Sequence, residues 1–273
     1  MAIITISRQL ASLGDETAHE LAKLLDYRFV DKLSLEERIK SYGVAGPKLE
    51  KYDERKPTLF AAFSQDRDDY LHFLKTAMLA EAGEGSCVFI GRGAFTLFRD
   101  LPGVLSVFLV APMDIRVERV KSYFHCDDKR ARQIIEQSDH DRVGFHRYFF
   151  DVNWKDPSNY HLTLNMGSLH PALAARIIKE LKDETIGAEA EAKHACALND
   201  MALGQQIIHH ILYEKGIPVH FLETAVSKGE ASLYGVVNVQ TQVESAIAAA
   251  KDVPGVVRVI SEIQVVKEYN VVP

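Results

Sequence analysis

Ser7, Arg8 and Gly14 belong to a stretch whose residue types could bind a phosphate. The apolar run Ile3–Ile6 is typical of a buried strand, and a helix is expected from Asp15, followed by apolar residues at helical spacing. A loop between a strand and a helix presents backbone N–H groups that favour an anion. The stretch lacks the G-x-x-x-x-G-K-[ST] signature, since Asp15 stands where a phosphate-gripping lysine would be. It predicts either a phosphate loop or an ordinary strand-to-helix turn.

A second candidate follows another strand pattern. Cys87–Ile90 is apolar and leads into Gly91-Arg92-Gly93, and Val104–Val110 is a further apolar run. Strands that alternate with helical patterns predict an α/β fold with a largely parallel sheet. Ligands of such sheets bind at the carboxyl ends of the strands. Ser7-Arg8 and Gly91-Arg92-Gly93 are therefore expected to share one site.

Charged residues dominate the helical region that begins after Pro112. They are Arg116, Arg119, Lys121, Asp127, Asp128, Lys129, Arg130, Arg132, Asp139, Asp141, Arg142 and Arg147. Guanidinium forks match phosphate oxygens, so an arginine-bearing hairpin could clamp a transferring phosphoryl group. The alternative is a solvated helix face whose arginines pair with aspartates at the surface. For any single arginine the alternative is favoured, because exposed ion pairs are common and weak.

Composition bounds the class of protein. A chain of 273 residues with 47% apolar residues can bury one large or two ordinary cores, and a net charge of −6 argues against broad nucleic-acid binding. The three cysteines are far apart, so neither a disulfide framework nor a metal site is expected. We see no secretion signal and no apolar run of about 18 residues, and therefore expect a soluble cytoplasmic protein.

Two domains are predicted, over residues 1–182 and 199–273, with a linker of small and charged residues at 183–198. The other predictions for the first domain are a helix capped by Ser34, an irregular segment at Gly43–Pro57, helices at Asp66–Ala82 and Pro171–Lys182, and a strand at His161–Asn165. Those for the second are helices at Met201–Tyr213 and Gln240–Lys251 and strands at Val219–Ala225, Ala231–Val237 and Val256–Val265, a small α+β domain. His209 and His210 lie mid-helix, where a core or surface role is expected without a third metal ligand.

The first 182 residues resemble the cytidylate kinase-like family of nucleoside monophosphate kinases. The resemblance is carried by Ile4–Gln9 with Ser12, Gly14 and Glu16, by Ile90–Ala94, Arg99-Asp100 and Phe108–Pro112 with Arg116, and by Asp139, Arg142, Arg147-Tyr148 and Trp154–Tyr160. It implies a P-loop fold with a helical, arginine-bearing lid. It also implies transfer of a phosphoryl group from ATP, with Mg²⁺, to CMP or a related acceptor.

Position by position, the resemblance also implies roles for individual residues. Those implied to cradle the donor phosphates are Ser7, Arg8, Ser12, Gly14, Asp15, Glu16 and Thr17. Those implied to hold the acceptor phosphate are Gly91, Arg92 and Gly93, and Arg142 and Arg147 are implied to act from the lid. The loop of this family usually reads like S-R-E-Y-G-S-G-G-R-E, whereas this chain has Ala11, Leu13 and Asp15 in place of two glycines and a basic residue. A catalytically inactive pseudokinase that serves as a scaffold is therefore the alternative to an active kinase.

Residues 199–273 resemble a BON domain. The resemblance is carried by Ala231–Val237, Val243, Ala246, Ala249, Pro254–Val259 and Ile263–Val265. BON domains are associated with binding to phospholipid surfaces or other ligands. Because the segment has no strong basic face, a membrane-surface role is the weakest hypothesis. We expect a module that binds a ligand or partner or mediates self-association, beside a domain whose partner is a small-molecule nucleotide.

Overall fold

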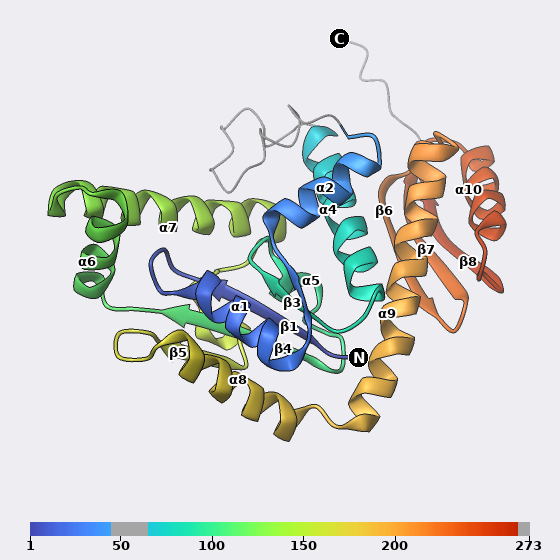
Figure 1. Cartoon of the computed structure of the whole chain (residues 1–273). Helices are drawn as coiled ribbons and strands as arrows, with labels where there is room; N and C mark the ends of the chain where they lie inside the picture. Colours follow the sequence, from blue (N-terminus) through green and yellow to red (C-terminus); the bar gives the residue numbers. More distant parts are fainter. Residues whose placement is uncertain (45–64, 267–273) are drawn as a thin grey trace, which may run out of the picture. The chain divides into compact units, whose positions relative to one another are not determined.

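The structure is a computed structural model that describes residues 1–44 and 65–266, and the chain divides into two compact units after His194. The first unit contains β1 (Ile3–Arg8), α1 (Gly14–Leu25), β2 (Arg28–Val30), α2 (Lys32–Ser41), α4 (Gln65–Gly83), β3 (Cys87–Ile90), α5 (Ala94–Leu97), β4 (Val104–Val110), α6 (Met113–Phe124), α7 (Asp128–Phe150), β5 (Leu162–Asn165) and α8 (Pro171–Thr185) (Figure 1). The predicted irregular segment Gly43–Pro57 falls mostly in 45–64, outside the described residues.

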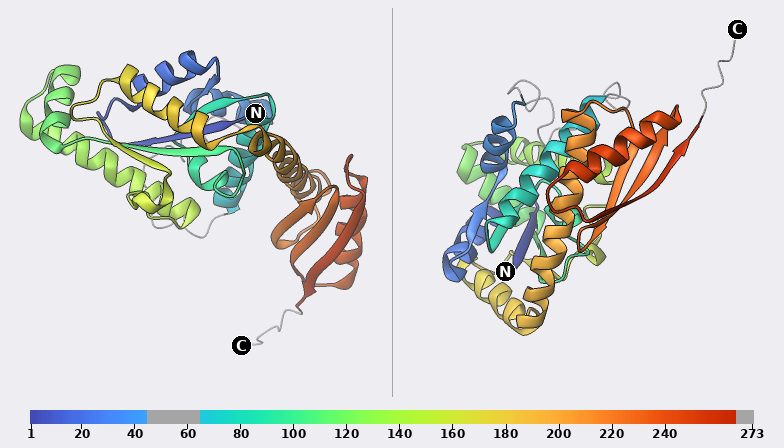
Figure 2. Two further views of the ribbon diagram at one scale, coloured as in Figure 1. Left: turned by 90° about the horizontal axis from the view of Figure 1, so that it is seen from below. Right: turned by 90° about the vertical axis from the view of Figure 1, so that its right-hand side faces the viewer.

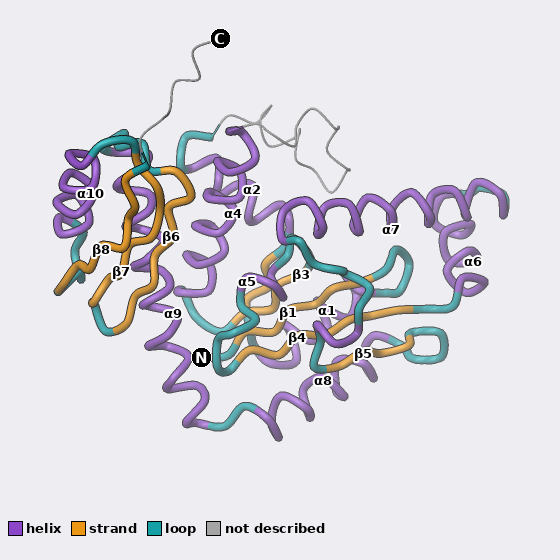
Figure 3. The backbone as a smooth tube through the Cα atoms, turned by 180° about the vertical axis from the view of Figure 1, so that it is seen from behind, coloured by secondary structure: helices purple, strands orange, loops and turns teal. Residues whose placement is uncertain are grey.

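The first unit is built on a five-stranded parallel sheet with the order β2-β3-β1-β4-β5 (Figure 3). The predicted α/β fold with a parallel sheet is therefore confirmed. Alternate side chains of each strand point to opposite faces. One face carries Ile4 and Ile6 of β1, which pack in one core with apolar residues of α1 and α8. An aromatic cluster of Phe95, Phe108, Trp154 and Tyr160 forms a second core.

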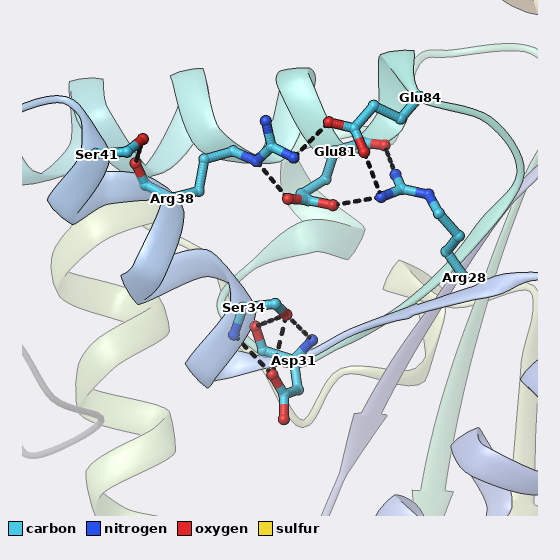
Figure 4. Close-up of polar contacts among 7 residues, drawn as sticks. All are labelled: Arg28, Asp31, Ser34, Arg38, Ser41, Glu81 and Glu84. Carbon is cyan, nitrogen blue, oxygen red and sulfur yellow. Dashed lines mark hydrogen bonds and ion pairs between the residues drawn. The ribbon is translucent and has the colours of Figure 1, made fainter.

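The start of α2 differs from the prediction. Ser34 was expected to cap this helix, but the helix begins at Lys32 and its cap is Asp31. The Asp31 carboxylate accepts from the Ser34 N–H at 2.9 Å, and the Ser34 hydroxyl accepts from the Asp31 N–H at 2.9 Å (Figure 4). Aspartate is as favoured at a helix cap as serine, and it was not considered from the sequence. The reciprocal hydrogen bonds of a capping box make Asp31 the N-cap of α2.

Two arginines and two glutamates join β2, α2 and the end of α4. Arg28 Nη1 donates to Glu81 Oε2 at 2.8 Å and to Glu84 Oε2 at 2.7 Å. Arg38 donates to the second oxygen of each of the same carboxylates. Each glutamate is therefore bridged between two guanidinium groups (Figure 4). A shared network of this kind holds α2 and α4 together better than isolated surface pairs would.

Glu84 gives this network a pH dependence. The hydrogen bond from Arg38 holds the pKa of the Glu84 carboxyl below its ordinary value of 4.5. A pKa lowered by folding contributes stability that is fully present above about pH 4.5 and is lost as the pH falls through the folded-state pKa. We expect Glu84→Gln to lower Tm at about pH 7, with a difference from wild type that shrinks below about pH 4. A difference that stays constant on acidification would contradict this, and Glu37→Gln, an exposed position on α2, is the control.

The second unit is small and has its own core. α9 (Ala188–His209) enters it and is followed by a π-helical turn (His210–Glu214), β6 (His220–Ser227), β7 (Glu230–Val237), α10 (Gln240–Asp252) and β8 (Arg258–Val265). The mixed sheet β6-β7-β8 pairs β7 antiparallel to β6 and parallel to β8 (Figure 2). Its buried side chains pack with Ile207, Ile211 and the apolar residues of α10. The predicted α+β character is confirmed.

Helix extends into the segment that was predicted as a linker. α8 runs to Thr185 and α9 begins at Ala188, so only two residues of 183–198 lie between the helices. Alanine recurs through this segment, and alanine has the highest helix propensity. Separately, none of the described helices has the length and apolar character needed to cross a bilayer.

Candidate phosphate-binding site

The loop between β1 and α1 adopts a backbone that favours glycine, although the residues concerned are not glycine. Ala11 has φ 60° and Leu13 has φ 58°, both in the left-handed region. They stand at two positions where the resemblance implies glycine. Leu13 precedes α1 and offers no side-chain acceptor, so the first N–H groups of the helix receive no cap from it. Residues with left-handed backbone occur in the turns whose N–H groups bind anions.

Three buried hydroxyls support the loop. The Ser12 hydroxyl lies 2.9 Å from the Gln9 carbonyl oxygen and 3.1 Å from that of Leu109, and the Thr17 hydroxyl donates to Leu13 at 2.6 Å. Ser7 is also buried and shares a hydrogen bond with Tyr160. Burial raises the pKa of the Tyr160 hydroxyl, and the bond with Ser7 opposes that rise. Ser7, Ser12 and Thr17 are thus engaged within the protein.

Two arginines of α6 hold the outer side of the loop. Arg116 Nε donates to the Leu10 carbonyl at 2.7 Å, and Arg119 donates to the carbonyls of Ala11 at 3.0 Å and Met166 at 2.7 Å. Burial lowers the pKa of Arg119, and the charge of Glu16 opposes this effect. With Leu10 and Ala11 carbonyls fixed by these donors, the peptide units of the loop have little freedom to rotate.

Asp139 of α7 closes a ring of hydrogen bonds around Leu10. One of its carboxylate oxygens accepts from the Leu10 N–H at 3.3 Å, and the other accepts from Arg116 Nη2 at 2.8 Å. The Asp139 and Arg116 side chains are 9% and 3% exposed. Both backbone groups of Leu10 are therefore bound by one buried ion pair. The prediction that the aspartates of this region pair at the surface is wrong for Asp139, because helix packing buries it.

Arg8 lies across the start of α1. A Cβ added at Gly14 would be 2.4 Å from Arg8 Cγ, so the arginine stem occupies the space that glycine leaves. Arg8 Nη2 is 3.4 Å from the carboxylate of Asp15, which is 63% exposed. Glu16 is also exposed. A guanidinium thus stands beside the position where a phosphate-binding lysine is absent.

Gly91-Arg92-Gly93 forms the neighbouring part of the site. Ile6 of β1 pairs with Ile90 of β3, so Arg8 and Arg92 each follow the paired residues by two positions. All three residues of the turn have positive φ, at 75°, 53° and 78°. The two stretches lie at adjacent strand ends, as the parallel sheet predicted.

Arg92 is buried and held by groups from three helices. Its guanidinium donates to the Tyr70 hydroxyl at 3.3 Å, lies 3.6 Å from the Glu36 carboxylate and stacks over Phe145 at 5.7 Å. The side chain is 3% exposed. These contacts fix its charge before any ligand arrives, which is the arrangement that makes a fixed cation effective toward an anion.

The two predicted lid arginines face different directions. Arg142 is buried, donates to the Ser138 hydroxyl at 2.8 Å and lies 3.9 Å from Asp139. Arg147 is exposed on the same helix. Five helical residues correspond to a rotation of about 140°. The structure brings Arg142 toward the loop through Asp139 and does not bring Arg147 beside it.

Sequence reasoning assigned no site role to several of these residues. Arg116, Arg119 and Asp139 were noted as members of a charged helical region, and Arg116 and Asp139 also as part of a resemblance, but none was predicted to hold the loop, and Glu36 and Tyr70 were not singled out as site residues. Leu10 and Asp139 are 129 positions apart, so no local spacing connects them. Among the described residues, no group of three or more His, Cys, Asp or Glu side chains is arranged to hold a metal ion.

Comparison with known proteins agrees with this architecture. A sequence model of the cytidylate kinase-like family matches residues 3–168. The chain belongs to the cytidylate kinase-like family. A BON domain model matches residues 199–267, so this family member also carries a BON domain. No curated protein matches the chain by sequence.

Among solved structures, an uncharacterized protein from Eubacterium ventriosum ATCC 27560 is similar, with 25% identity, coverage of 67% of this chain and 98% of that chain, and a TM-score of 0.56. Shikimate kinase from Acinetobacter baumannii in complex with shikimate matches at 15% identity, with 68% and 96% coverage and a TM-score of 0.39. A gluconokinase from Sinorhizobium meliloti 1021 matches at 14% identity, with 67% and 94% coverage and a TM-score of 0.41. The first unit has a P-loop kinase-like fold.

Proposed function

We propose that this cytidylate kinase-like protein transfers a phosphoryl group from ATP to a nucleoside monophosphate, CMP or a related acceptor. The observation that carries the proposal is the β1–α1 loop, because it keeps left-handed backbone at Ala11 and Leu13 without glycine. Left-handed backbone at such residues is unfavourable by roughly 1–2 kcal/mol each, and surrounding contacts must maintain it. That the loop keeps this shape supports a role for it in binding phosphate.

The residues of the site have distinct roles in this proposal. ATP, bound with Mg²⁺, supplies the phosphoryl group. The loop N–H groups and Arg8 would hold its phosphates, because an N–H cluster beside a guanidinium favours anionic oxygens. Arg92, at the end of the neighbouring strand, would hold the acceptor phosphate and keep it close to the donor. Arg142 would add positive charge from α7.

A product assay tests this function. Purified protein is incubated with ATP, Mg²⁺ and each of CMP, dCMP, UMP and AMP, and nucleotides are separated by ion-exchange chromatography. We expect one monophosphate to yield its diphosphate: CMP, dCMP or UMP in amounts equal to the ADP formed, or AMP with two ADP formed for each ATP consumed. If no acceptor yields a diphosphate, the proposed activity is refuted.

A second candidate function is a pseudokinase scaffold whose BON domain binds a ligand or partner. Asp15 favours it, because an exposed carboxylate stands where a cation would contact phosphate and pairs with Arg8. Restoring a cation tests the point. If Asp15 is what limits turnover, Asp15→Arg should raise kcat about 10- to 100-fold, since one charge-stabilising donor is worth roughly 3–4 kcal/mol at most.

Glu20→Arg is the matched control for Asp15→Arg. It makes a similar change of charge at another exposed position of α1 and should leave kcat within about twofold of wild type. Ordinary turnover by the wild type would refute the scaffold hypothesis. If neither the wild type nor Asp15→Arg forms a diphosphate, the scaffold hypothesis is favoured and the kinase hypothesis fails.

A further inference from the structure

The contacts of the β1–α1 loop with α6 and α7 are more extensive than a turn needs for its own stability. Besides the ion pair at Leu10, the side chains of Leu10 and Ala11 pack against the apolar core of the α6–α7 hairpin, which includes Val117, Val120 and Ile135. The loop is thus attached to the hairpin by both polar and apolar contacts.

Arg116 and Asp139 occupy the centre of this attachment. Arg116 uses Nε for the Leu10 carbonyl and Nη2 for Asp139, and Asp139 uses its other oxygen for the Leu10 N–H. A planar guanidinium can bridge two acceptors at once in this way, and a lysine cannot reproduce the geometry. Rotation of the peptide units on either side of Leu10 would break one of these bonds. The pair therefore restrains the loop backbone on both sides of Leu10.

The same pair connects the loop to Arg142. Asp139 lies one helical turn before Arg142 on α7, and their side chains are 3.9 Å apart. Movement of α7 away from the loop would separate Asp139 from Leu10 and carry Arg142 with it. The orientation of α7 and the shape of the loop are consequently linked through one buried carboxylate.

We propose that Arg116 of α6 and Asp139 of α7 are positioning residues. By restraining the β1–α1 loop, they set its affinity for the polyphosphate of a nucleotide. The proposal deepens the proposed function and rests on it, in that the loop is taken to bind the donor phosphates. We expect the pair to act on the donor more than on the acceptor, because Arg92, which is proposed to hold the acceptor, has its polar contacts with Tyr70 of α4 and Glu36 of α2.

The test is the double variant Arg116→Met/Asp139→Leu. Removing both charges avoids a lone buried ion, and replacing a buried ion pair by apolar residues of similar size is often tolerated by the fold. Two quantities are measured: amide hydrogen exchange of residues 9–13 in the ligand-free protein, and the Kd of ATP with Mg²⁺ and of CMP by calorimetry. We expect exchange at least 10-fold faster, a Kd for ATP at least 10-fold higher, and a Kd for CMP within twofold of wild type.

Lys121→Met/Asp128→Leu is the matched control. This pair of half-buried Lys121 and exposed Asp128 also joins α6 to α7, at 2.6 Å, and within the described part of the chain Lys121 pairs with Asp128 and Glu118, not with loop residues. It should leave exchange at 9–13 and both Kd values within twofold of wild type. If the first double variant does not fold, Arg116→Lys is used in its place. The same changes in exchange and in the Kd of ATP are expected, but smaller, because lysine can keep only one of the two bonds that Arg116 makes to Leu10 and Asp139.

The outcomes separate this proposal from the proposed function. If the wild type binds no nucleotide, the proposed function fails, and hydrogen exchange of the ligand-free loop still decides whether the pair restrains it. Exchange at 9–13 that stays within twofold of wild type overturns the positioning role. So does an equal rise in the Kd of ATP and of CMP, which would indicate a general loss of structure.

Discussion

Replacing Arg92 with methionine is expected to lower kcat/KM for the nucleoside monophosphate at least about 100-fold while leaving the protein folded. The guanidinium is buried and fixed by Tyr70, Glu36 and Phe145 before ligand binds. Loss of one preorganised group that stabilises charge is worth roughly 2.7–4 kcal/mol, which corresponds to 10²- to 10³-fold in rate. Methionine keeps a long apolar stem in a buried position, so the packing is largely retained.

The fold should tolerate this change because Glu36 keeps another partner. Its carboxylate is 23% exposed and lies 3.7 Å from Lys32, so water and a lysine remain to compensate its charge. Initial rates with varied acceptor measure the effect, and circular dichroism and Tm measure the fold. Arg99→Met is the control, since Arg99 is exposed and bonded to Asn159, and its kcat/KM should stay within about twofold of wild type. If the Arg92→Met enzyme has wild-type kcat/KM, Arg92 does not contribute to the acceptor site.

Gly93→Ala is expected to destabilise the first unit by about 2–5 kcal/mol. Gly93 has φ +78°, and a Cβ there would lie 2.2 Å from the ring of Phe150. Left-handed backbone costs a residue with a Cβ roughly 1–2 kcal/mol, and forcing a packed ring aside costs roughly 1–3 kcal/mol more. The substitution therefore combines two independent penalties at one residue.

Urea unfolding followed by fluorescence measures the loss. Gly43→Ala separates the two penalties, because Gly43 has φ +85° and no atom of the described residues lies within 4 Å of an added Cβ. It should cost only about 1–2 kcal/mol, the backbone part alone. If Gly93→Ala is no more destabilising than Gly43→Ala, the Phe150 ring moves aside freely and the tight packing against this turn has no energetic role.

Much of the fold could be predicted because the strands of a buried parallel sheet are short apolar runs. Val104–Val110 was predicted with the bounds that β4 has, and the alternation with helices gave the parallel sheet. The start of α2 was wrong because Ser34 and Asp31 are both good caps, and only their reciprocal bonds distinguish them. Sequence patterns give the type of an element more reliably than its first residue.

The candidate site was predictable only where its residues follow strands. Ser7-Arg8 and Gly91-Arg92-Gly93 could be expected at one sheet edge, because register makes neighbouring strands end together. The ring of bonds between Leu10, Arg116 and Asp139 could not be expected, because it depends on how α6 and α7 pack on the loop. The left-handed backbone of Ala11 and Leu13 was equally hidden, since alanine and leucine do not favour it.

At residue 92 the backbone conformation and the side chain have opposite preferences. The backbone there, at φ 53°, would be relaxed by glycine, which has no Cβ to strain. The side chain there is a buried cation that glycine would delete. Glycine would recover roughly 1–2 kcal/mol of backbone strain, but it would leave a cavity beside Tyr70, Glu36 and Phe145 that costs roughly 2–5 kcal/mol. Selection of a variant library for thermal resistance alone should therefore enrich a long apolar residue such as methionine at residue 92, whereas selection for nucleotide turnover should return arginine. Comparing the two enriched sets would map where this protein has kept activity at the expense of stability.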